Sequence, residues 1–350
     1  MDLGVEAEKR GKKLRILVSR LRFLGDIIIT TPVIASLKKR YPEAELYYLA
    51  DARYVDILEE NPALDGIIRL EKGNRSFLRT VKQLRSLDIT AAIDLYYNPT
   101  SANLLFLSRI PIRIGGRRKW RRHLYTSTCQ VPVGVRSAVS HHLHFIEGLD
   151  CDVSERCPAV YLSAKEEEAG RQSIEELFSG RRGELKVIAF HAGGTWQSKK
   201  WPVRGFAELA RTLCTKGSYG VVLLTGPGEE DENRRIVLES GTDVKIIPYS
   251  PLRDTAAMMN ACDAVVANDG GILHLAIALG LPVTGIFGPT EPDIWFPYEG
   301  MGPFALATRN EECAPCHLHH CEDRKCLDML KMETVLEKLV EVTEWTDLTC

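Results

Sequence analysis

The sequence predicts an α/β protein built from two doubly wound parallel sheets. Apolar strand-like runs alternate with helical segments over the first half of the chain, with short connections. This alternation stops at residues 163–184 and then begins again. A length of 350 residues also suits two domains better than one core. We therefore expect two domains of the same architecture.

The first half contains four strand-like runs in order. RILVS at residues 15–19 precedes a glycine turn and a helix that stops before Pro42, because the residue before a proline disfavours helical geometry. AELYYLA, GIIRL and ITAAIDL follow, separated by helical segments at residues 54–60 and 76–87. Strands joined by helical crossovers pair in parallel, so these runs predict one parallel sheet.

Residues 163–184 are polar and helical, and Ser163 with Glu166 fits a capping box. The strand pattern then restarts with KVIAFHAGG and continues through GVVLLTGPG, VKIIPYS, AVVANDGG and PVTGIFGPT. The helical runs between them include VRGFAELARTLCTK, DTAAMMNA and ILHLAIALG. Two Rossmann-like halves of this kind predict a ligand cleft between them, at the carboxyl ends of the strands.

The expected domain plan follows directly from these patterns. It comprises a disordered lead-in at 1–13, a first domain at 14–162, a linker helix at 163–184, a second domain at 185–330 and a C-terminal helix at 331–350 that packs back across the domains.

Composition excludes several classes of protein. Charged residues make up 26% of the chain and the net charge is −2, which does not favour nucleic acid as a partner. No apolar run reaches membrane-spanning length, and the N-terminus lacks the apolar core of a signal peptide. We therefore expect a cytoplasmic protein.

Two glycine loops are candidates for binding a phosphate. The chain contains neither a GxGxxG fingerprint nor a Walker A motif, which argues against dinucleotide enzymes and P-loop kinases. Asp269, Gly270 and Gly271 follow a buried strand and open a helix, whose free N–H groups favour an anion. His274, on the first turn of that helix, could reach the same anion. A plain turn is the alternative.

The loop HAGGTWQSKKWP follows the first strand of the second half and has similar chemistry. It offers Thr195, Ser198, Lys199 and Lys200, and either lysine could neutralise a diphosphate. A solvated basic loop is the alternative. Glu229 heads the next helix, where it could bind ribose hydroxyls or cap the helix.

The stretch LRFLGDIIITTP carries a single acid, Asp26, at the start of an apolar helix. A carboxylate there could cap the helix, because it accepts backbone N–H bonds and suits the positive end of the dipole. It could equally act as a general base.

The run RIGGRRKWRRH, residues 113–123, concentrates positive charge: six of its eleven residues are Arg or Lys. In a chain of net charge −2 this concentration favours an anionic partner or membrane surface, although a solvated loop is the alternative. The candidate residues are Arg113, Arg117, Arg118, Lys119, Arg121 and Arg122.

Four cysteines are clustered with the spacing C-x2-C-x4-C-x4-C, at Cys313, Cys316, Cys321 and Cys326. The ligand types fit a structural zinc site, but the spacing is tighter than usual. It matches neither common iron–sulfur form, and the haem-attachment pattern CAPCH would require export. Thiols packing a compact loop are the alternative to a metal.

The order of LRFLGDIIITTP, HAGG…SKKWP, LLTGPGEE and NDGGILHLAIALGLPVTGIFGPT resembles glycosyltransferase family 9, the ADP-heptose:lipopolysaccharide heptosyltransferases. The resemblance runs from about residue 14 to about residue 330. It implies a GT-B fold, an ADP-heptose donor held by the second half, a lipid A–Kdo type acceptor held by the first, and inversion at the anomeric carbon. It also implies work on the cytoplasmic face of the inner membrane, with no required cofactor.

The resemblance assigns roles to individual residues. Asp26 matches the family's catalytic base, Lys199 its phosphate-binding lysine, and Glu229 an acid near the donor ribose. Asp269, Gly270, Gly271 and His274 match the donor loop, although the family usually has Thr or Ser where this chain has Gly270. Two alternatives remain: an enzyme acting on another nucleotide sugar, including an epimerase, and a non-catalytic ADP-sugar-binding protein.

Overall fold

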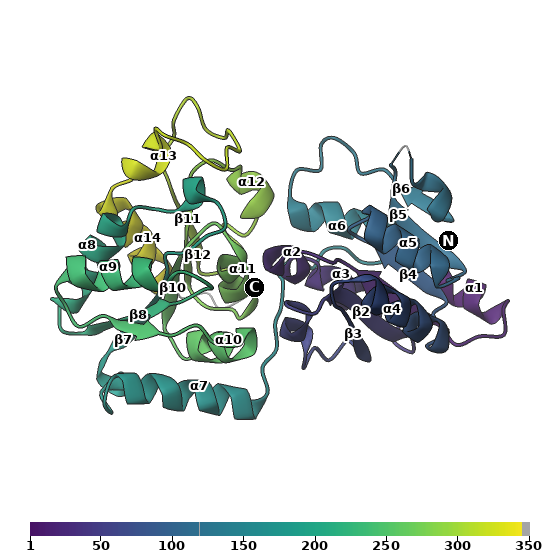
Figure 1. Ribbon diagram of the computed structural model, residues 1–350, viewed down its shortest axis with the longest axis horizontal. Coiled ribbons are helices and arrows are strands. Elements are labelled where there is room, and N and C mark those ends of the chain that lie inside the picture. Colours follow the sequence, from purple (N-terminus) through teal and green to yellow (C-terminus); the bar gives the residue numbers. More distant parts are fainter. Residues whose placement is uncertain (119, 345–350) are drawn as a thin grey trace. The chain divides into compact units, whose positions relative to one another are not determined.

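The computed structural model describes residues 1–118 and 120–344, and it divides into two compact units, Met1–Tyr161 and Leu162–Cys350. Each unit contains a six-stranded parallel sheet covered by helices (Figure 1). The α/β architecture with two doubly wound sheets is therefore confirmed.

The first unit's sheet has the strand order β3-β2-β1-β4-β5-β6. Its strands are β1 (Arg15–Ser19), β2 (Glu45–Asp51), β3 (Gly66–Leu70), β4 (Ala91–Asp94), β5 (Ile112–Gly116) and β6 (Ser127–Cys129). Leu17 at the centre of β1 pairs with Tyr47 on one side and Ala92 on the other. The chain reverses its direction of winding between β1 and β4, and such a switch point opens a crevice at the carboxyl ends of the strands.

The helices of the first unit include one that the sequence pattern does not predict. They are α1 (Leu3–Glu8), α2 (Leu24–Ile28), α3 (Thr31–Arg40), η1 (Val55–Leu58), α4 (Asn74–Ser86), α5 (Pro99–Leu107), η2 (Arg122–Leu124) and α6 (Ala138–Glu147). The expected disordered lead-in at residues 1–13 is wrong, because α1 lies within it. Asp2 accepts the backbone N–H of Gly4 at 2.8 Å, and Leu3 is fully buried. A cap and a buried anchor together order this short segment.

The second unit's sheet has the order β12-β11-β10-β7-β8-β9, with its switch point between β10 and β7. Its strands are β7 (Lys186–His191), β8 (Tyr219–Leu224), β9 (Lys245–Ile247), β10 (Ala264–Asn268), β11 (Val283–Phe287) and β12 (Phe304–Thr308). The three central strands are buried along their length except at Lys186, as expected for a parallel sheet covered on both faces.

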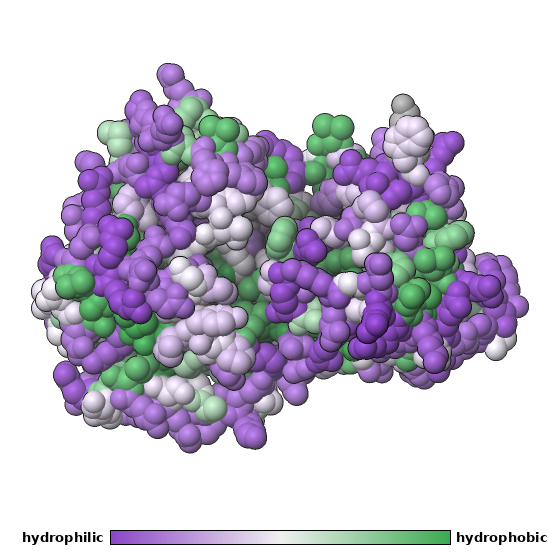
Figure 2. All heavy atoms as spheres, in the orientation of Figure 1, coloured by the Kyte–Doolittle hydropathy of each residue, from purple (hydrophilic) through white to green (hydrophobic). Residues whose placement is uncertain are grey.

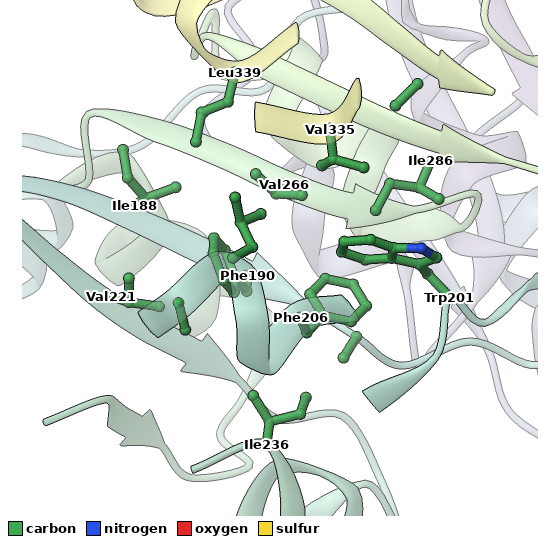
Figure 3. Packing of buried hydrophobic residues seen from close by; sticks show 14 of the residues in the cluster. Ile188, Phe190, Trp201, Phe206, Val221, Ile236, Val266, Ile286, Val335 and Leu339 are labelled. Carbon is green, nitrogen blue, oxygen red and sulfur yellow. The ribbon is translucent and has the colours of Figure 1, made fainter. Parts of the chain in front are cut away.

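The helices of the second unit are α7 (Ala164–Leu177), η3 (Arg182–Glu184), η4 (Gln197–Lys199), α8 (Val203–Cys214), α9 (Glu230–Ser240), α10 (Leu252–Asn260), α11 (Gly271–Ala278), α12 (Pro292–Trp295), α13 (Lys325–Asp328) and α14 (Met332–Thr343). One hydrophobic core packs α8, α9, α13 and α14 against this sheet. Phe190, Trp201 and Phe206 meet at the centre of the core (Figure 3).

The C-terminal helix α14 belongs to that same core. Val335, Leu339 and Val342 are buried there at helical spacing, and Figure 3 shows the first two over the sheet near Ile286 and Val266. The expectation that residues 331–350 pack back across the domains is therefore not supported, since α14 uses its apolar face within the second unit. Residues 345–350 lie outside the described part of the chain.

Helix α7 is likewise an integral part of the second unit rather than a separate linker at 163–184. The predicted capping box is present: Ser163 N–H donates to Glu166 Oε2 at 2.8 Å, and the Ser163 hydroxyl accepts the Glu166 N–H. Glu166 also forms a two-pronged ion pair with Arg253 of α10, at 2.5 and 2.6 Å. A Cβ on Gly170 would lie 2.1 Å from the carbonyl oxygen of Ala257, so glycine is required for this close packing.

The Glu166–Arg253 pair generates a prediction about stability and pH. The hydrogen bond from Arg253 is the main cause that lowers the pKa of Glu166 to about 2. A carboxyl whose folded pKa is depressed stabilises the fold above its unfolded pKa, and this contribution disappears as pH falls through the folded pKa. Glu166→Gln should therefore lower the free energy of unfolding by about 2 kcal/mol at pH 7.

Urea unfolding of both proteins at a series of pH values checks this expectation. The difference in the free energy of unfolding between wild type and variant should be constant from pH 7 to about pH 5. It should become smaller between about pH 4.5 and pH 2. Glu176→Gln, at an exposed position on the same helix, is the control and should leave stability unchanged. A difference that does not change with pH would contradict the assignment.

Candidate functional site

Asp26 lies at the switch point of the first sheet. It is the third residue of α2, and its carboxylate accepts the backbone N–H of Phe23 at 2.9 Å and an Arg20 Nη2 hydrogen at 2.5 Å. The Arg20 guanidinium in turn stacks over the ring of Tyr96, 4.6 Å from its centroid. Arg20 follows β1 and Tyr96 follows β4, so this contact joins the two sides of the crevice.

This geometry gives Asp26 both of the roles that its sequence position allows. The carboxylate satisfies a free N–H at the helix start, which is a capping role. It is also 14% exposed, and a carboxylate has about four acceptor positions, so the two observed bonds leave room for a hydroxyl from a ligand. The Asp26 carboxylate is therefore held in one orientation, and part of the side chain remains accessible to a ligand.

A pocket of about 710 Å³ lies in the first unit, at the carboxyl ends of β1 to β4. Its wall combines the basic side chains Arg22 and Lys72, the aromatic rings of Phe77 and Tyr96, and several amides and hydroxyls. The remaining lining residues are Leu21, Asp51, Leu70, Glu71, Gly73, Asn74, Asn98, Pro99, Thr100, Asn103 and Leu107. No sequence motif marks this pocket, although Arg22, Glu71 and Tyr96 lie just after predicted strands. Tyr96 connects it to Arg20 and hence to Asp26.

The basic run does not line this pocket. The Arg113 guanidinium donates to the carbonyl oxygens of Leu124, at 2.7 Å, and Ile110, and burial lowers its pKa. The Arg113 guanidinium therefore binds backbone carbonyl groups, contrary to the expectation that it binds an anion. Lys119 lies outside the described residues.

The other members of the run are closer to the surface. Arg117, Arg118 and Arg122 are exposed, while Arg121 is half-buried. Arg117 bonds Gln130 at 3.0 Å, and Arg118 stacks over the Tyr97 ring. Trp120 is 84% exposed beside them.

In the second unit, Lys199 and Asp269 meet across the switch point. Lys199 Nζ lies 2.6 Å from Asp269 Oδ2, and the same oxygen accepts the hydroxyl of Thr290 at 2.5 Å. Lys199 sits on η4 after β7, Asp269 directly follows β10, and Thr290 follows β11, so three loops converge here. Lys199 is 16% exposed and Asp269 5%, which leaves the ammonium as the accessible partner.

Asn268 fixes the distance between two of these loops. Its amide donates to the carbonyl oxygens of Ala192, at 2.6 Å, and Gly193, at 3.2 Å, and its own oxygen accepts the N–H of Trp201 at 3.1 Å. The side chain is fully buried, and these bonds give both its amide nitrogen and its amide oxygen a hydrogen-bond partner. The last residue of β10 thereby holds both ends of the loop after β7.

Glu229 lies against the same loop. Its carboxylate accepts the N–H of Gly226 at 2.7 Å and lies 3.3 Å from His191 Nε2. Burial raises the pKa of Glu229, but the hydrogen bond and charge of His191 outweigh it, and the net pKa falls below the ordinary value. A Cβ on Gly193 would lie only 1.8 Å from Glu229 Oε1, so glycine is needed for this approach.

The structure separates the remaining candidates. Gly270 and Gly271 form the cap and first residue of α11, and Thr195 is exposed on the loop after β7. His274, by contrast, is 4% exposed, with Nδ1 3.4 Å from the Tyr298 hydroxyl. Its contact with an anion at the helix start stays a prediction.

Lys200 takes a different direction from Lys199. Its Nζ pairs with Glu232 of α9 at 2.7 Å. The sequence could not choose between these neighbouring lysines, but in the structure only Lys199 of the two joins Asp269 at the switch point.

The four clustered cysteines do not form a metal site in the described part of the chain, where no group of three His, Cys, Asp or Glu side chains is arranged to hold a metal ion. Cys313 is exposed and Cys326 buried. Burial, followed by the charges of the other three cysteines, raises the pKa of Cys326. The expected metal at this cluster is therefore not supported.

Hydrophilic residues cover much of the face shown in Figure 2, with smaller apolar patches between them. Among residues 1–118 and 120–344, none of the helices has the length and apolar character needed to span a bilayer.

Comparison with known proteins identifies relatives over most of the chain. Residues 77–326 match the family model described as glycosyltransferase family 9 (heptosyltransferase). Lipopolysaccharide heptosyltransferase 1 of Pseudomonas aeruginosa is 26% identical over 338 residues, covering 90% of this chain and 91% of that protein. Lipopolysaccharide heptosyltransferase 2 of Escherichia coli K12 is 26% identical, covering 80% of this chain and 84% of that protein.

Solved structures share the fold. A glycosyltransferase family 9 protein of Veillonella parvula superposes with a TM-score of 0.81 at 23% identity, covering 94% of this chain and 97% of that one. ADP-heptose lipopolysaccharide heptosyltransferase II of E. coli gives 0.77 at 22% identity, covering 94% and 98%. These likenesses confirm the GT-B fold. With a family match over more than two thirds of its length, the chain belongs to glycosyltransferase family 9, the heptosyltransferase family, and is a glycosyltransferase.

Proposed function

We propose that this enzyme transfers heptose from ADP-heptose to an inner-core sugar of lipopolysaccharide, with inversion at the anomeric carbon. Family membership and relatives named as lipopolysaccharide heptosyltransferases support the reaction. The observation that carries the mechanism is Asp26, a fixed and partly accessible carboxylate beside a polar pocket.

The second unit supplies the donor site in this proposal. Lys199 uses one ammonium hydrogen on Asp269 and has two more for the diphosphate. The N–H groups at Gly270 and Gly271 open α11 and favour the same negative charge. Glu229, held by His191 and Gly226, binds the ribose hydroxyls. Together these groups stabilise the charge that develops on the leaving ADP.

The first unit supplies the base. Asp26 takes the proton of the acceptor hydroxyl while that oxygen forms a bond to the anomeric carbon of heptose. The bond between this carbon and the diphosphate oxygen breaks, and ADP leaves from the opposite face. A positioned base of this kind contributes about 10²–10⁴-fold to the rate.

The 710 Å³ pocket is the proposed acceptor site. Kdo carboxylates and lipid A phosphates are anions, and Arg22 and Lys72 are the groups in the pocket wall that could bind them. The wall also carries Asp51 and Glu71, and Arg22 Nε lies 3.8 Å from Asp51 Oδ2. Phe77 and Tyr96 offer flat apolar faces to a sugar ring, while the amides and hydroxyls suit its hydroxyl groups. Tyr96 contacts Arg20, the partner of Asp26, so the pocket adjoins the base.

The basic run supports a second contact, with the membrane that carries the acceptor. Arg117, Arg118 and Arg122 are exposed beside Trp120, which is 84% exposed. Basic residues next to an exposed tryptophan favour an anionic lipid surface. We place this contact at the cytoplasmic face of the inner membrane.

Asp26→Asn tests the base directly. The amide keeps an oxygen for the Phe23 N–H but cannot take a proton, so kcat should fall by about 10²–10⁴-fold while the Kd for ADP stays unchanged. The measurement is ADP release from ADP-heptose, with and without a Kdo–lipid A acceptor. Glu43→Gln, at an exposed position of the same unit, is the control.

Each outcome distinguishes the candidate functions. Unchanged release in Asp26→Asn would reduce Asp26 to a helix cap. Release that needs no acceptor would favour an enzyme that acts on the nucleotide sugar alone. Absence of release from the wild type would favour a binding protein or another donor sugar.

Substitutions in the pocket test the acceptor site. Arg22→Ala and Lys72→Ala should each raise the KM for the acceptor about tenfold, because each removes a charged hydrogen-bond partner. The KM for ADP-heptose should not change. Arg117→Ala, outside the pocket, is the matched control on soluble acceptor; a larger effect there than at Arg22 and Lys72 would move the acceptor site to the basic run.

Gly193→Ala tests the donor site. The added Cβ displaces Glu229, so affinity for ADP should fall and the fold should lose about 1–3 kcal/mol through overpacking. Gly194→Ala is the neighbouring control, because its Cβ would meet only ordinary contacts at 3.6 and 3.9 Å. Titration calorimetry and thermal unfolding measure both effects. Equal behaviour of the two variants would refute the role given to Gly193.

A further inference from the structure

The loop that carries Lys199 is contacted by the cysteine-rich segment, residues 313–326, which the proposed reaction does not use. Lys199 Nζ lies over the ring of Trp196, 4.5 Å from its centroid. The His319 imidazole stacks on the same ring, with centroids 3.8 Å apart and planes 25° apart. A histidine of the cysteine-rich segment is therefore linked to the diphosphate lysine through one indole.

Hydrogen bonds attach the segment to this loop at Gln197, Ser198 and Lys200. Ser198 donates its N–H to the carbonyl oxygen of His319 at 3.3 Å, and its hydroxyl to that of Leu318. The Arg324 guanidinium donates to the carbonyl oxygens of Gln197, at 3.1 Å, and Lys200, at 2.9 Å. The segment is thus bonded to the residues on either side of Lys199 in the chain, Ser198 and Lys200.

The same segment also contacts the loop after β11. The N–H groups of Cys316 and His317 both donate to the carbonyl oxygen of Pro289, at 3.0 and 2.9 Å. The next residue, Thr290, bonds Asp269, which holds Lys199. Two routes thus lead from the cysteine-rich segment to one ammonium group, through Trp196 and through Asp269.

We propose that His319 is a positioning residue, which holds Trp196 and thereby keeps Lys199 directed at the diphosphate of the donor. This inference rests on the proposed ADP-sugar function. His319 is exposed and Trp196 only half-buried, so the stack adds little to the core. Its effect is to restrict a loop that begins with two glycines, Gly193 and Gly194. Restricting a binding loop in its bound form increases affinity by reducing the ordering cost.

The test compares binding of ADP with binding of adenosine, which lacks the diphosphate. His319→Ala should weaken ADP binding about three- to tenfold, the range expected for one lost aromatic pair. Adenosine binding should not change. His319→Phe restores a flat ring and should bind ADP as the wild type does. His320→Ala changes the adjacent exposed histidine and is the control.

A double-mutant cycle separates positioning from general loosening of the loop. If His319 acts through Lys199, then His319→Ala should cause no further loss of ADP affinity in a Lys199→Gln background. Additive losses, a parallel loss of adenosine binding, or wild-type ADP affinity in His319→Ala would each overturn the proposal. Failure of the wild type to bind ADP would instead overturn the proposed donor and this inference with it.

Discussion

The ion pair between Lys199 and Asp269 is the interaction on which the architecture of the second unit's site depends. It joins the loops after β7 and β10, the two strands at the switch point, and Asp269 is almost fully buried. Removing one partner of a buried pair costs about 3–5 kcal/mol, because the other charge is left without compensation. Thr290 bonds Asp269 and the Trp196 ring lies under Lys199, while Asn268 holds both ends of the loop that carries the lysine.

The first unit also joins the two sides of its switch point, but with different groups. Its sheet also reverses winding, between β1 and β4, and Arg20 with Tyr96 joins the two sides. Here both members of the ion pair are partly exposed, Arg20 at 15% and Asp26 at 14%, whereas in the second unit Lys199 is more exposed than its buried partner Asp269. In the proposed mechanism, one topology thus supplies a proton acceptor from one half and a phosphate partner from the other.

The sequence could predict what depends on local pattern. Buried parallel strands are apolar runs, so β1 and β7 are visible in it, and glycine loops mark the switch points. Short exposed β6 and the capped helix α1 lack such a signal. Arg113 lies in a run of high charge density but bonds backbone carbonyls, and His274 is buried one turn into its helix. The 710 Å³ pocket of the first unit combines segments after four strands, which no single motif contains.

The carboxylate of Asp26 closes the start of α2, and in the proposed reaction it is also the base. Under that mechanism, selection for an ordered helix and selection for transfer act on one side chain. A descendant that kept the nucleotide-sugar site but lost transfer would still need a hydrogen-bond acceptor at position 26, and asparagine would suffice. Under the proposed mechanism, an acid at position 26 is therefore needed for transfer but not for binding the nucleotide sugar.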